Sequence, residues 1–347
     1  MKTLKLSRFF AATLAAILLL GVGSAYAADR TVKIAIGSTS FAWFPLYVAQ
    51  GAGYFKDEGL NVEIINVPAN STPAAAMLSG SADLGGLGVQ TAFNAIDKGQ
   101  PIKILTPMVT AYTSTIFVRK GLMKEAGLTR NSPMVDKVKF LVGKKLATTA
   151  IGAGPHLMYR YLFKKYLNGA DVDKLSEVVP IGDSAPTLAA MKRGIIDVSA
   201  FSPPVPEKAV ADDIGEVMID FIGGDVPEIA GAIYVVLVVT DDKLKTDGPM
   251  VASFVRAIER ANKLAQSDLG AAGKAAKTQL GSMESDLYAQ AVKSMAPALP
   301  KTATTSVQGL QTFMNLLLEA GYKFNTIDVK TITANEFVEK ALKEKKQ

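Results

Sequence analysis

Residues 31–67, TVKIAIGSTSFAWFPLYVAQGAGYFKDEGLNVEIINV, contain the pattern that decides the fold. Thr31–Ile36 is rich in β-branched residues, which predicts a strand. Pro45–Phe55 predicts a helix, because proline suits a first turn and apolar residues then recur on one face. Asn61–Val67 predicts a second strand. Strands that alternate with helices at this spacing favour a mostly parallel sheet with both faces covered.

The same alternation continues along the chain and then begins again. The first series continues with a helix over Thr72–Ser79, a strand over Ala82–Leu87, a helix over Gln90–Asp97 and a strand over Ile102–Leu105. The second has strands over Lys145–Thr149, Glu177–Ile181 and Asp197–Phe201, and helices over His156–Leu167, Pro186–Arg193 and Pro206–Asp212. Two extended runs, Tyr112–Lys120 and Gly231–Thr240, lie between and after the series. The sequence therefore predicts an α/β fold of two doubly wound lobes joined by two hinge segments.

We expect this architecture to divide the chain as follows. A signal peptide covers residues 1–27, and the first lobe consists of residues 28–114 and 236–347, including a largely helical C-terminal part. The second lobe consists of residues 115–235. Two covalent crossings make a hinge, and the cleft between two hinged lobes is where we expect a ligand to be buried.

The first 27 residues have the features of an export signal. Lys2, Lys5 and Arg8 form a positive head, an apolar core follows over Phe9–Leu20, and Ala25-Tyr26-Ala27 matches the small-x-small cleavage pattern. The apolar core is shorter than the roughly 20 residues that a membrane span needs. Because the chain has no cysteine, a lipid cannot be attached through one. We therefore expect a soluble, unlipidated protein of the periplasm.

The composition excludes several kinds of chemistry. With no cysteine and a single histidine, the chain cannot form a disulfide, a thiolate site or a zinc site built on two histidines. No G-x-S-x-G nucleophile motif is present. We expect no catalytic residues, no metal and no cofactor. Without the signal peptide the net charge falls from +6 to +3, and no basic cluster with interleaved aromatic residues indicates a nucleic-acid partner.

The candidate ligand-binding residues lie in loops that follow predicted strands, where open α/β sheets bind their ligands. In the first lobe they are Ser38, Thr39, Ser40, Trp43, Asn70, Gly88, Gln90, Thr110 and Tyr112, and in the second lobe Thr149, Gly152, Gly154, His156 and Ser184. Hydroxyl groups and free amides at helix N-termini can hold an anion or a polar head group without a salt bridge. Each residue also has a structural alternative: a helix cap for the hydroxyls, the core for Trp43, and a cap or surface position for His156.

Four blocks of the sequence are similar to a known family. They are Trp43–Val62 (WFPLYVAQGAGYFKDEGLNV), Gly80–Gly88 (GSADLGGLG), Leu141–Leu146 (LVGKKL) with Gly152–His156 behind it, and Met191–Ala200 (MKRGIIDVSA). Together they resemble the sulfonate/nitrate/taurine-type solute-binding proteins of ABC importers, a superfamily that includes thiamine-pyrimidine synthases. Two positions depart from the family pattern: Leu146 replaces a β-branched residue, and Ala153 replaces a hydroxyl that would face the ligand.

The resemblance implies a type II periplasmic binding protein fold, a small-molecule ligand and an ABC permease as partner, and we expect a monomer. No lysine or arginine stands in the candidate loops, so we expect a small organic ligand, anionic or heteroaromatic, with an apolar body. Two alternatives stay open. One is an enzyme on the same fold, of the thiamine-pyrimidine or menaquinone-pathway type, and the other is a sensory binding module.

Overall fold

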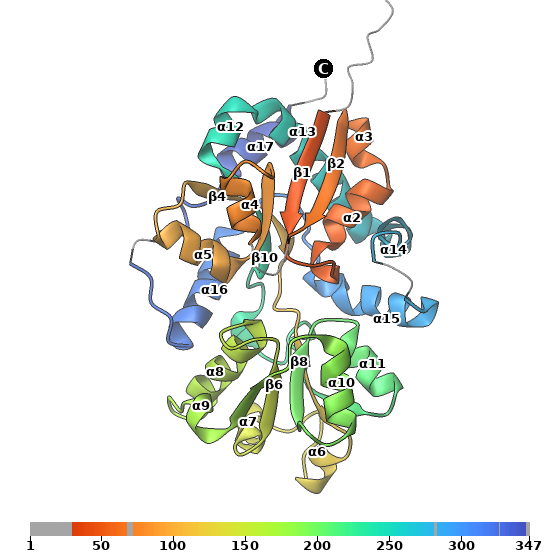
Figure 1. The fold of residues 1–347 in the computed structure, drawn as a ribbon, viewed down its shortest axis with the longest axis vertical. Helices are drawn as coiled ribbons and strands as arrows, with labels where there is room; N and C mark the ends of the chain where they lie inside the picture. Colours follow the sequence, from red (N-terminus) through yellow and green to blue (C-terminus); the bar gives the residue numbers. More distant parts are fainter. Residues whose placement is uncertain (1–29, 68–71, 281–282, 326, 345–347) are drawn as a thin grey trace, which may run out of the picture.

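The computed structural model describes residues 30–67, 72–280, 283–325 and 327–344. The predicted signal peptide and Asn70 lie outside the described residues. Two five-stranded sheets form the centres of two lobes (Figure 1). In order across sheet A the strands are β2 (Leu60–Asn66), β1 (Arg30–Ile36), β3 (Leu84–Gly88), β10 (Val235–Thr240) and β4 (Ile102–Val109). In order across sheet B they are β7 (Glu177–Pro180), β6 (Lys145–Thr148), β8 (Val198–Phe201), β5 (Thr115–Arg119) and β9 (Gly215–Ile219).

The two sheets have the same design, and the predicted pair of mostly parallel lobes is confirmed. β1 pairs in parallel with β2 and β3, and β6 pairs in parallel with β7 and β8. Each sheet also contains one antiparallel strand, which is the first strand that the chain forms after it crosses from the other sheet. β10 lies antiparallel between β3 and β4, with Val235 opposite Gly88 and Val109, and β5 lies antiparallel between β8 and β9.

Helices cover both sheets. Around sheet A the first series contributes α2 (Phe44–Gly51), α3 (Tyr54–Asp57), α4 (Pro73–Leu78) and α5 (Val89–Asp97). Around sheet B lie α6 (Leu122–Glu125), α7 (Met134–Leu141), α8 (Gly154–Tyr166), α9 (Val172–Leu175), α10 (Ser184–Lys192) and α11 (Val205–Ala211). The C-terminal part forms α12 (Asp241–Thr246), α13 (Gly248–Ser267), α14 (Leu269–Ala276), α15 (Ser285–Met295), α16 (Val307–Glu319) and α17 (Asn335–Lys343). Short 3-10 turns are η1 (Phe41–Trp43), η2 (Pro227–Ile229) and η3 (Ala296–Ala298).

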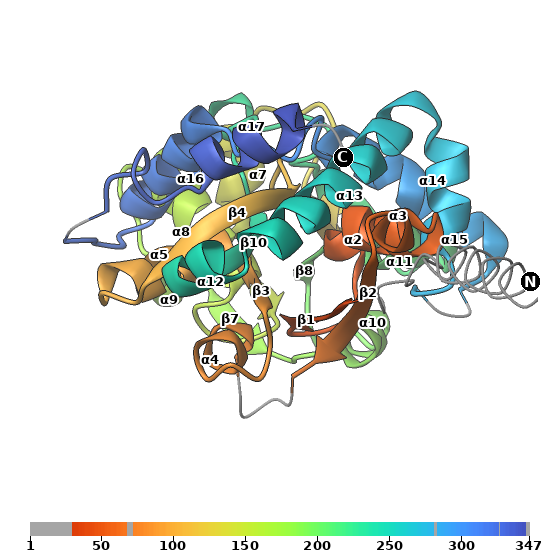
Figure 2. The same ribbon diagram turned by 90° about the horizontal axis from the view of Figure 1, so that it is seen from above.

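The alternation of side chains along β10 shows how sheet A is buried. Val235, Leu237 and Val239 enter the core beneath α2 and α13, whereas Val236 and Val238 enter the core on the other face, beneath α4 and α5. Figure 2 shows α13 and α4 on opposite sides of this sheet. A strand that is covered on both faces has no solvent-exposed side, which explains why residues 235–239 are uniformly apolar.

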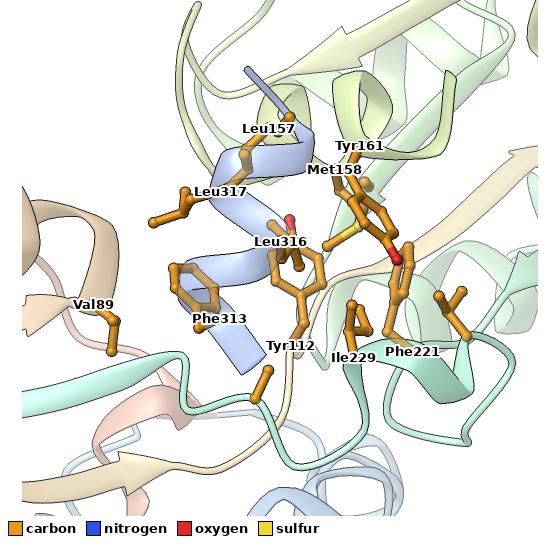
Figure 3. Close-up of a cluster of buried hydrophobic side chains, with 14 of the residues drawn as sticks. Val89, Tyr112, Leu157, Met158, Tyr161, Phe221, Ile229, Phe313, Leu316 and Leu317 are labelled. Carbon is orange, nitrogen blue, oxygen red and sulfur yellow. The ribbon is translucent and has the colours of Figure 1, made fainter. Parts of the chain in front are cut away.

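The chain passes between the sheets over residues 110–114 and again over residues 220–234. A hydrophobic cluster joins the lobes beside these crossings: Phe313, Leu316 and Leu317 of α16 pack in one core with Leu157 and Met158 of α8 (Figure 3). Helix α15 likewise lies against α11 of the second lobe. The predicted lobe boundary at 235/236 falls inside β10, whose first residue is Val235.

Several sequence predictions differ from the structure. The helix over Pro45–Phe55 is interrupted, because Gly53 has a φ of 78° and separates α2 from α3. The extended run over Gly231–Thr240 forms a strand only from Val235 onward, because Gly231 turns the chain with a φ of 73°. β9 and α7 carried no prediction, because both lie outside the regular alternation.

Candidate functional site

A cavity of about 720 Å³ opens between the two lobes. It lies where loops leave the carboxyl ends of β1, β6, β7 and β8, the position at which α/β sheets bind ligands. The predicted residues that line it are Ser38, Thr39, Ser40, Thr149, Gly154 and Ser184. The rest of its lining is Phe41, Ser114, Pro155, Gly182, Asp183, Ala200, Phe201, Ser202, Pro203, Pro204, Val205, Tyr234, Leu280 and Met283. The structure therefore brings together loops from both lobes in one place.

The lining combines hydroxyl groups with apolar surface. Serine and threonine hydroxyls come from both lobes, while Phe41, Phe201 and Met283 supply apolar walls. Among the described lining residues there is no lysine or arginine, and Asp183 is the one carboxylate. α8 and α10 begin at the cavity, and in neither helix does the side chain of the N-cap residue, Ala153 or Asp183, accept a hydrogen bond from a first-turn amide. Pro155 and Pro186 in these first turns have no N–H, so the amides of Gly154 and Ser184 are the ones at the cavity that can meet a hydrogen-bond acceptor or an anion.

Trp43 supports the cavity from behind without lining it. Its side chain is 6% exposed, and its Nε1 donates a hydrogen bond to the Ser38 carbonyl oxygen at 3.0 Å. The indole ring packs directly on Gly86 of β3, where an added Cβ would lie 2.5 Å from the Trp43 ring. The aromatic wall expected from Trp43 is instead supplied by Phe41, two residues earlier on the same turn. Trp43 holds the Ser38–Ser40 loop in position.

Three other predicted residues also lie outside the lining. Gly88 ends β3, Gln90 lies in the first turn of α5, and neither borders the cavity. Thr110 binds the C-terminal part of the chain, since its amide and its Oγ1 both donate to the Ala298 carbonyl oxygen, at 2.8 and 3.1 Å. These contacts tie the first interlobe crossing to η3.

His156 is fully buried and shapes the loop before α8. The Gly152 amide donates to His156 Nδ1 at 2.9 Å, so the ring proton of a neutral histidine lies on Nε2. Nε2 then donates to the Asp173 carboxylate at 2.8 Å. Arg160 donates to the other carboxylate oxygen of Asp173 through two nitrogens, at 2.7 and 3.1 Å. Gly152 and His156 therefore set the conformation of residues 149–154 and do not border the cavity themselves.

This network makes a testable contribution to stability in acid. Burial raises the pKa of the Asp173 carboxyl, but the hydrogen bonds from Arg160 and His156 outweigh that effect and leave the pKa below its ordinary value. The unfolded chain, with a pKa of about 3.9 at this position, binds the proton more tightly. Stability from this group is therefore full above about pH 4 and is lost as the pH falls through the folded-state pKa.

Accordingly, Asp173→Asn should unfold at lower urea concentration than the wild type at pH 7, and the difference should shrink below about pH 4. Urea titrations at pH 7 and pH 3 measure it. A difference that stays constant over this range would show that Asp173 does not contribute through its charge.

Two tyrosines from the two crossings meet at the first residue of α8. The rings of Tyr112 and Tyr234 are 4.7 Å apart, and both hydroxyls approach the position that a Cβ on Gly154 would occupy. Burial raises the pKa of Tyr234 to about 12, so its hydroxyl stays protonated at neutral pH and can donate to a ligand. Tyr112 is 1% exposed, and its hydroxyl has no hydrogen-bond partner among the described residues. Tyr112 thus lies behind Tyr234, not in the lining.

Sequence reasoning missed Tyr234, Leu280 and Met283 as lining residues. Tyr234 lies inside a run that the sequence analysis predicted only as an extended segment, although an aromatic residue at the end of a crossing was a usable signal. Its amide donates to the Val109 carbonyl oxygen and its own carbonyl accepts from the Val89 amide, which holds it between the carboxyl ends of β4 and β3. Leu280 and Met283 come from the segment between α14 and α15, far along the chain, where no local pattern marks them.

Two features are absent from the described part of the chain. Within it, no three histidine or acidic side chains come together to hold a metal ion. No helix there is both long and apolar enough to cross a membrane.

Comparisons with known proteins agree with this architecture. The model of a family described as NMT1/THI5 like matches residues 40–268, about two thirds of the chain. A comparison with curated protein sequences finds no match.

Among solved structures, a protein of Bordetella bronchiseptica RB50 is 22% identical with a TM-score of 0.71, over 90% of this chain and 97% of that one. The zinc-bound ligand-binding component of an ABC-type import system from Staphylococcus aureus is 17% identical with a TM-score of 0.69. The match covers 90% of this chain and 99% of that one. The periplasmic aliphatic sulphonate binding protein SsuA from Escherichia coli is 15% identical with a TM-score of 0.63. The match covers 89% of this chain and 99% of that one. These similarities show that the fold is that of the type II periplasmic binding proteins.

Proposed function

Because this chain belongs to the NMT1/THI5-like family, we propose that it is the substrate-binding protein of an ABC importer. The observation that carries the proposal is the interlobe cavity, which collects loops from both lobes beside two chain crossings. Solved structures with the same fold include proteins described as an ABC-import ligand-binding component and as a sulphonate binding protein. Closure of the lobes would bury the ligand, and the permease would bind the closed state preferentially.

The ligand we propose is a small organic molecule with a polar or anionic end and an apolar or aromatic body. Hydroxyls such as Ser38, Thr149 and Ser184, with the amides at the starts of α8 and α10, fit hydrogen-bond acceptors. Phe41, Phe201 and Met283 fit the apolar body. The lack of a lysine or arginine among the described lining residues favours an organic ligand over a small inorganic oxyanion that needs a charged clamp.

The protein would act as a periplasmic monomer without a lipid anchor. The export signal expected over residues 1–27 and the absence of cysteine from the sequence support this location. We propose a receptor and not an enzyme, because the single histidine, His156, is held by Gly152 and Asp173 away from the cavity.

A ligand screen on the mature protein tests this function. Sulfonates, aromatic acids, pyrimidines and amino acids would be compared by thermal shift, and a true ligand at 100 times its dissociation constant should stabilise the fold by about 2.7 kcal/mol. Trp43 is the one tryptophan and is bonded to the cavity loop at Ser38, so ligand binding should also change its fluorescence.

Mass spectrometry of the bound compound after incubation provides the control. Recovery of the compound unchanged supports a receptor, whereas its conversion to a product would show that the protein is an enzyme and not a receptor. The absence of any stabilising compound across these classes would contradict the ligand class.

A further inference from the structure

A second cavity of about 650 Å³ lies between the lobes beside the first one, and the two share Pro203. We call it the interlobe groove. Its residues are Thr115, Pro203, Pro206, Glu207, Val210, Ala211, Val217, Asp220, Ile222, Gly223, Gln290, Lys293, Ser294 and Pro297. One wall is α11 with the end of β9, and the other is α15 with η3. In Figure 1, α11 and α15 lie at the same side of the molecule, one on each lobe.

The two walls belong to different moving parts. Helix α15 is fixed to the first lobe: Tyr288 and Met295 lie in the core that contains β1 and α13, and the Tyr288 hydroxyl donates to the Gly273 carbonyl at 2.6 Å. Helix α11 is fixed to the second lobe, where Ala209 packs in a core with Phe117 of β5. A rotation of the lobes about the two crossings therefore changes the width of the groove.

The groove carries opposite charges on its two walls. Glu207 of α11 and Lys293 of α15 both line it. The Glu207 Oε2 atom is buried and has no hydrogen-bond partner among the described residues. Lys293 is exposed and forms no ion pair within the described ranges. A buried carboxylate oxygen without a donor is unfavourable, and an ammonium group brought across the groove would relieve it.

A neighbouring pair of charges has the same complementarity. The pKa of Lys208 on α11 is raised mainly by its hydrogen bond with Asp212 and, to a smaller degree, by Glu284 at the start of α15. Opposite charges on α11 and at the start of α15 therefore occur at a second place beside the groove.

We propose that Glu207 and Lys293 form an interlobe ion pair when the lobes close, and that this pair regulates the cavity by stabilising its closed form. The proposal rests on the proposed function, in which the lobes close around a ligand. The ion pair itself can be measured in the ligand-free protein. An ion pair of this kind should change the ratio of closed to open molecules by up to about fivefold.

Spin labels offer a direct test, because the chain has no cysteine of its own. Cysteines at Asn94 of α5 and Lys192 of α10, both exposed, place one label on each lobe. Pulsed dipolar spectroscopy would then measure the interlobe distance in the ligand-free protein. We expect Glu207→Gln, Glu207→Lys and Lys293→Glu to reduce the population with the shorter distance, and the exchange Glu207→Lys with Lys293→Glu to restore it.

Lys263→Glu is the matched control, since it makes the same change of charge on α13, where Lys263 pairs with Glu259 of its own helix. It should leave the distance distribution unchanged. If the wild type, Glu207→Gln and Lys293→Glu have the same interlobe distance distribution, the ion pair is overturned. It is also overturned if the double variant with exchanged charges does not restore the wild-type distribution. These outcomes are independent of the ligand screen, so failure of the pair and failure of the proposed function are distinguishable.

Discussion

Replacement of Trp43 by alanine is expected to lower the free energy of unfolding by about 3–5 kcal/mol, the usual cost of removing a buried large aromatic side chain. The indole is 6% exposed, contacts Gly86 across the face of β3 and donates to the Ser38 carbonyl oxygen. The substitution removes this packing and leaves the Ser38 carbonyl without its donor. Urea unfolding followed by circular dichroism measures the loss, because the variant has no tryptophan fluorescence.

Gly86 provides a second measurement of the same contact. A Cβ at Gly86 would lie 2.5 Å from the Trp43 ring, so Gly86→Ala should cost about 1–3 kcal/mol in the wild type. In the Trp43→Ala background the ring is gone, and the added methyl group should cost less, since only Ile36 Cγ2, at 3.0 Å, still lies close to it. The two substitutions should therefore be clearly non-additive.

Ile151→Ala is the control for these variants, because Ile151 is 60% exposed on the loop before α8. It should change stability by less than about 0.5 kcal/mol. Additive costs for Trp43→Ala and Gly86→Ala would show that the indole does not pack on Gly86.

Gly154→Ala should weaken ligand binding about tenfold or more, equivalent to at least ~1.4 kcal/mol. A Cβ at Gly154 would collide with the Tyr234 hydroxyl, and the Tyr234 ring has little room to retreat because Tyr112 and Phe313 lie 4.7 and 6.1 Å from it. The methyl group would thus displace a lining side chain and intrude at the start of α8. Isothermal titration with the ligand found by the screen measures the effect.

Gly248→Ala is a closely matched control. Gly248 also begins a helix and is also followed by proline, but a Cβ there would meet Phe337 at an ordinary 3.6 Å. It should bind ligand like the wild type. Unchanged affinity in Gly154→Ala would place the ligand away from Tyr234, and equal losses in both variants would point to a general effect on folding.

Much of the fold could be predicted from local patterns. The alternation of β-branched runs with helical stretches indicated two doubly wound lobes, because strand and helix periodicities are properties of neighbouring residues. Prediction was poorest where the chain leaves that alternation. Ile233 and Tyr234 have strong β propensity, yet β10 begins only at Val235, after the turn at Gly231.

The residues of the candidate site also fall into two groups, those predictable from local sequence and those placed by contacts between distant segments. Residues directly after strands, such as Ser38, Thr149 and Ser184, line the cavity because strand ends of a parallel sheet open on one edge. The side chains of Trp43 and His156 were predicted for the same cavity, but partners distant in sequence turn them elsewhere: Gly86 lies against the indole, and Asp173 binds the imidazole.

The sequence by itself determined the class of fold, the loops from which a site could be built and the absence of lysine and arginine from those loops, since all three follow from residue type and short-range spacing. Only the tertiary structure decided which side chains face the cavity. That choice depends on contacts between distant segments, as when Tyr234 meets Gly154 and when Met283 closes one wall. It also decided that Glu207 and Lys293 face one groove, because the hinge brings together helices that no local pattern connects.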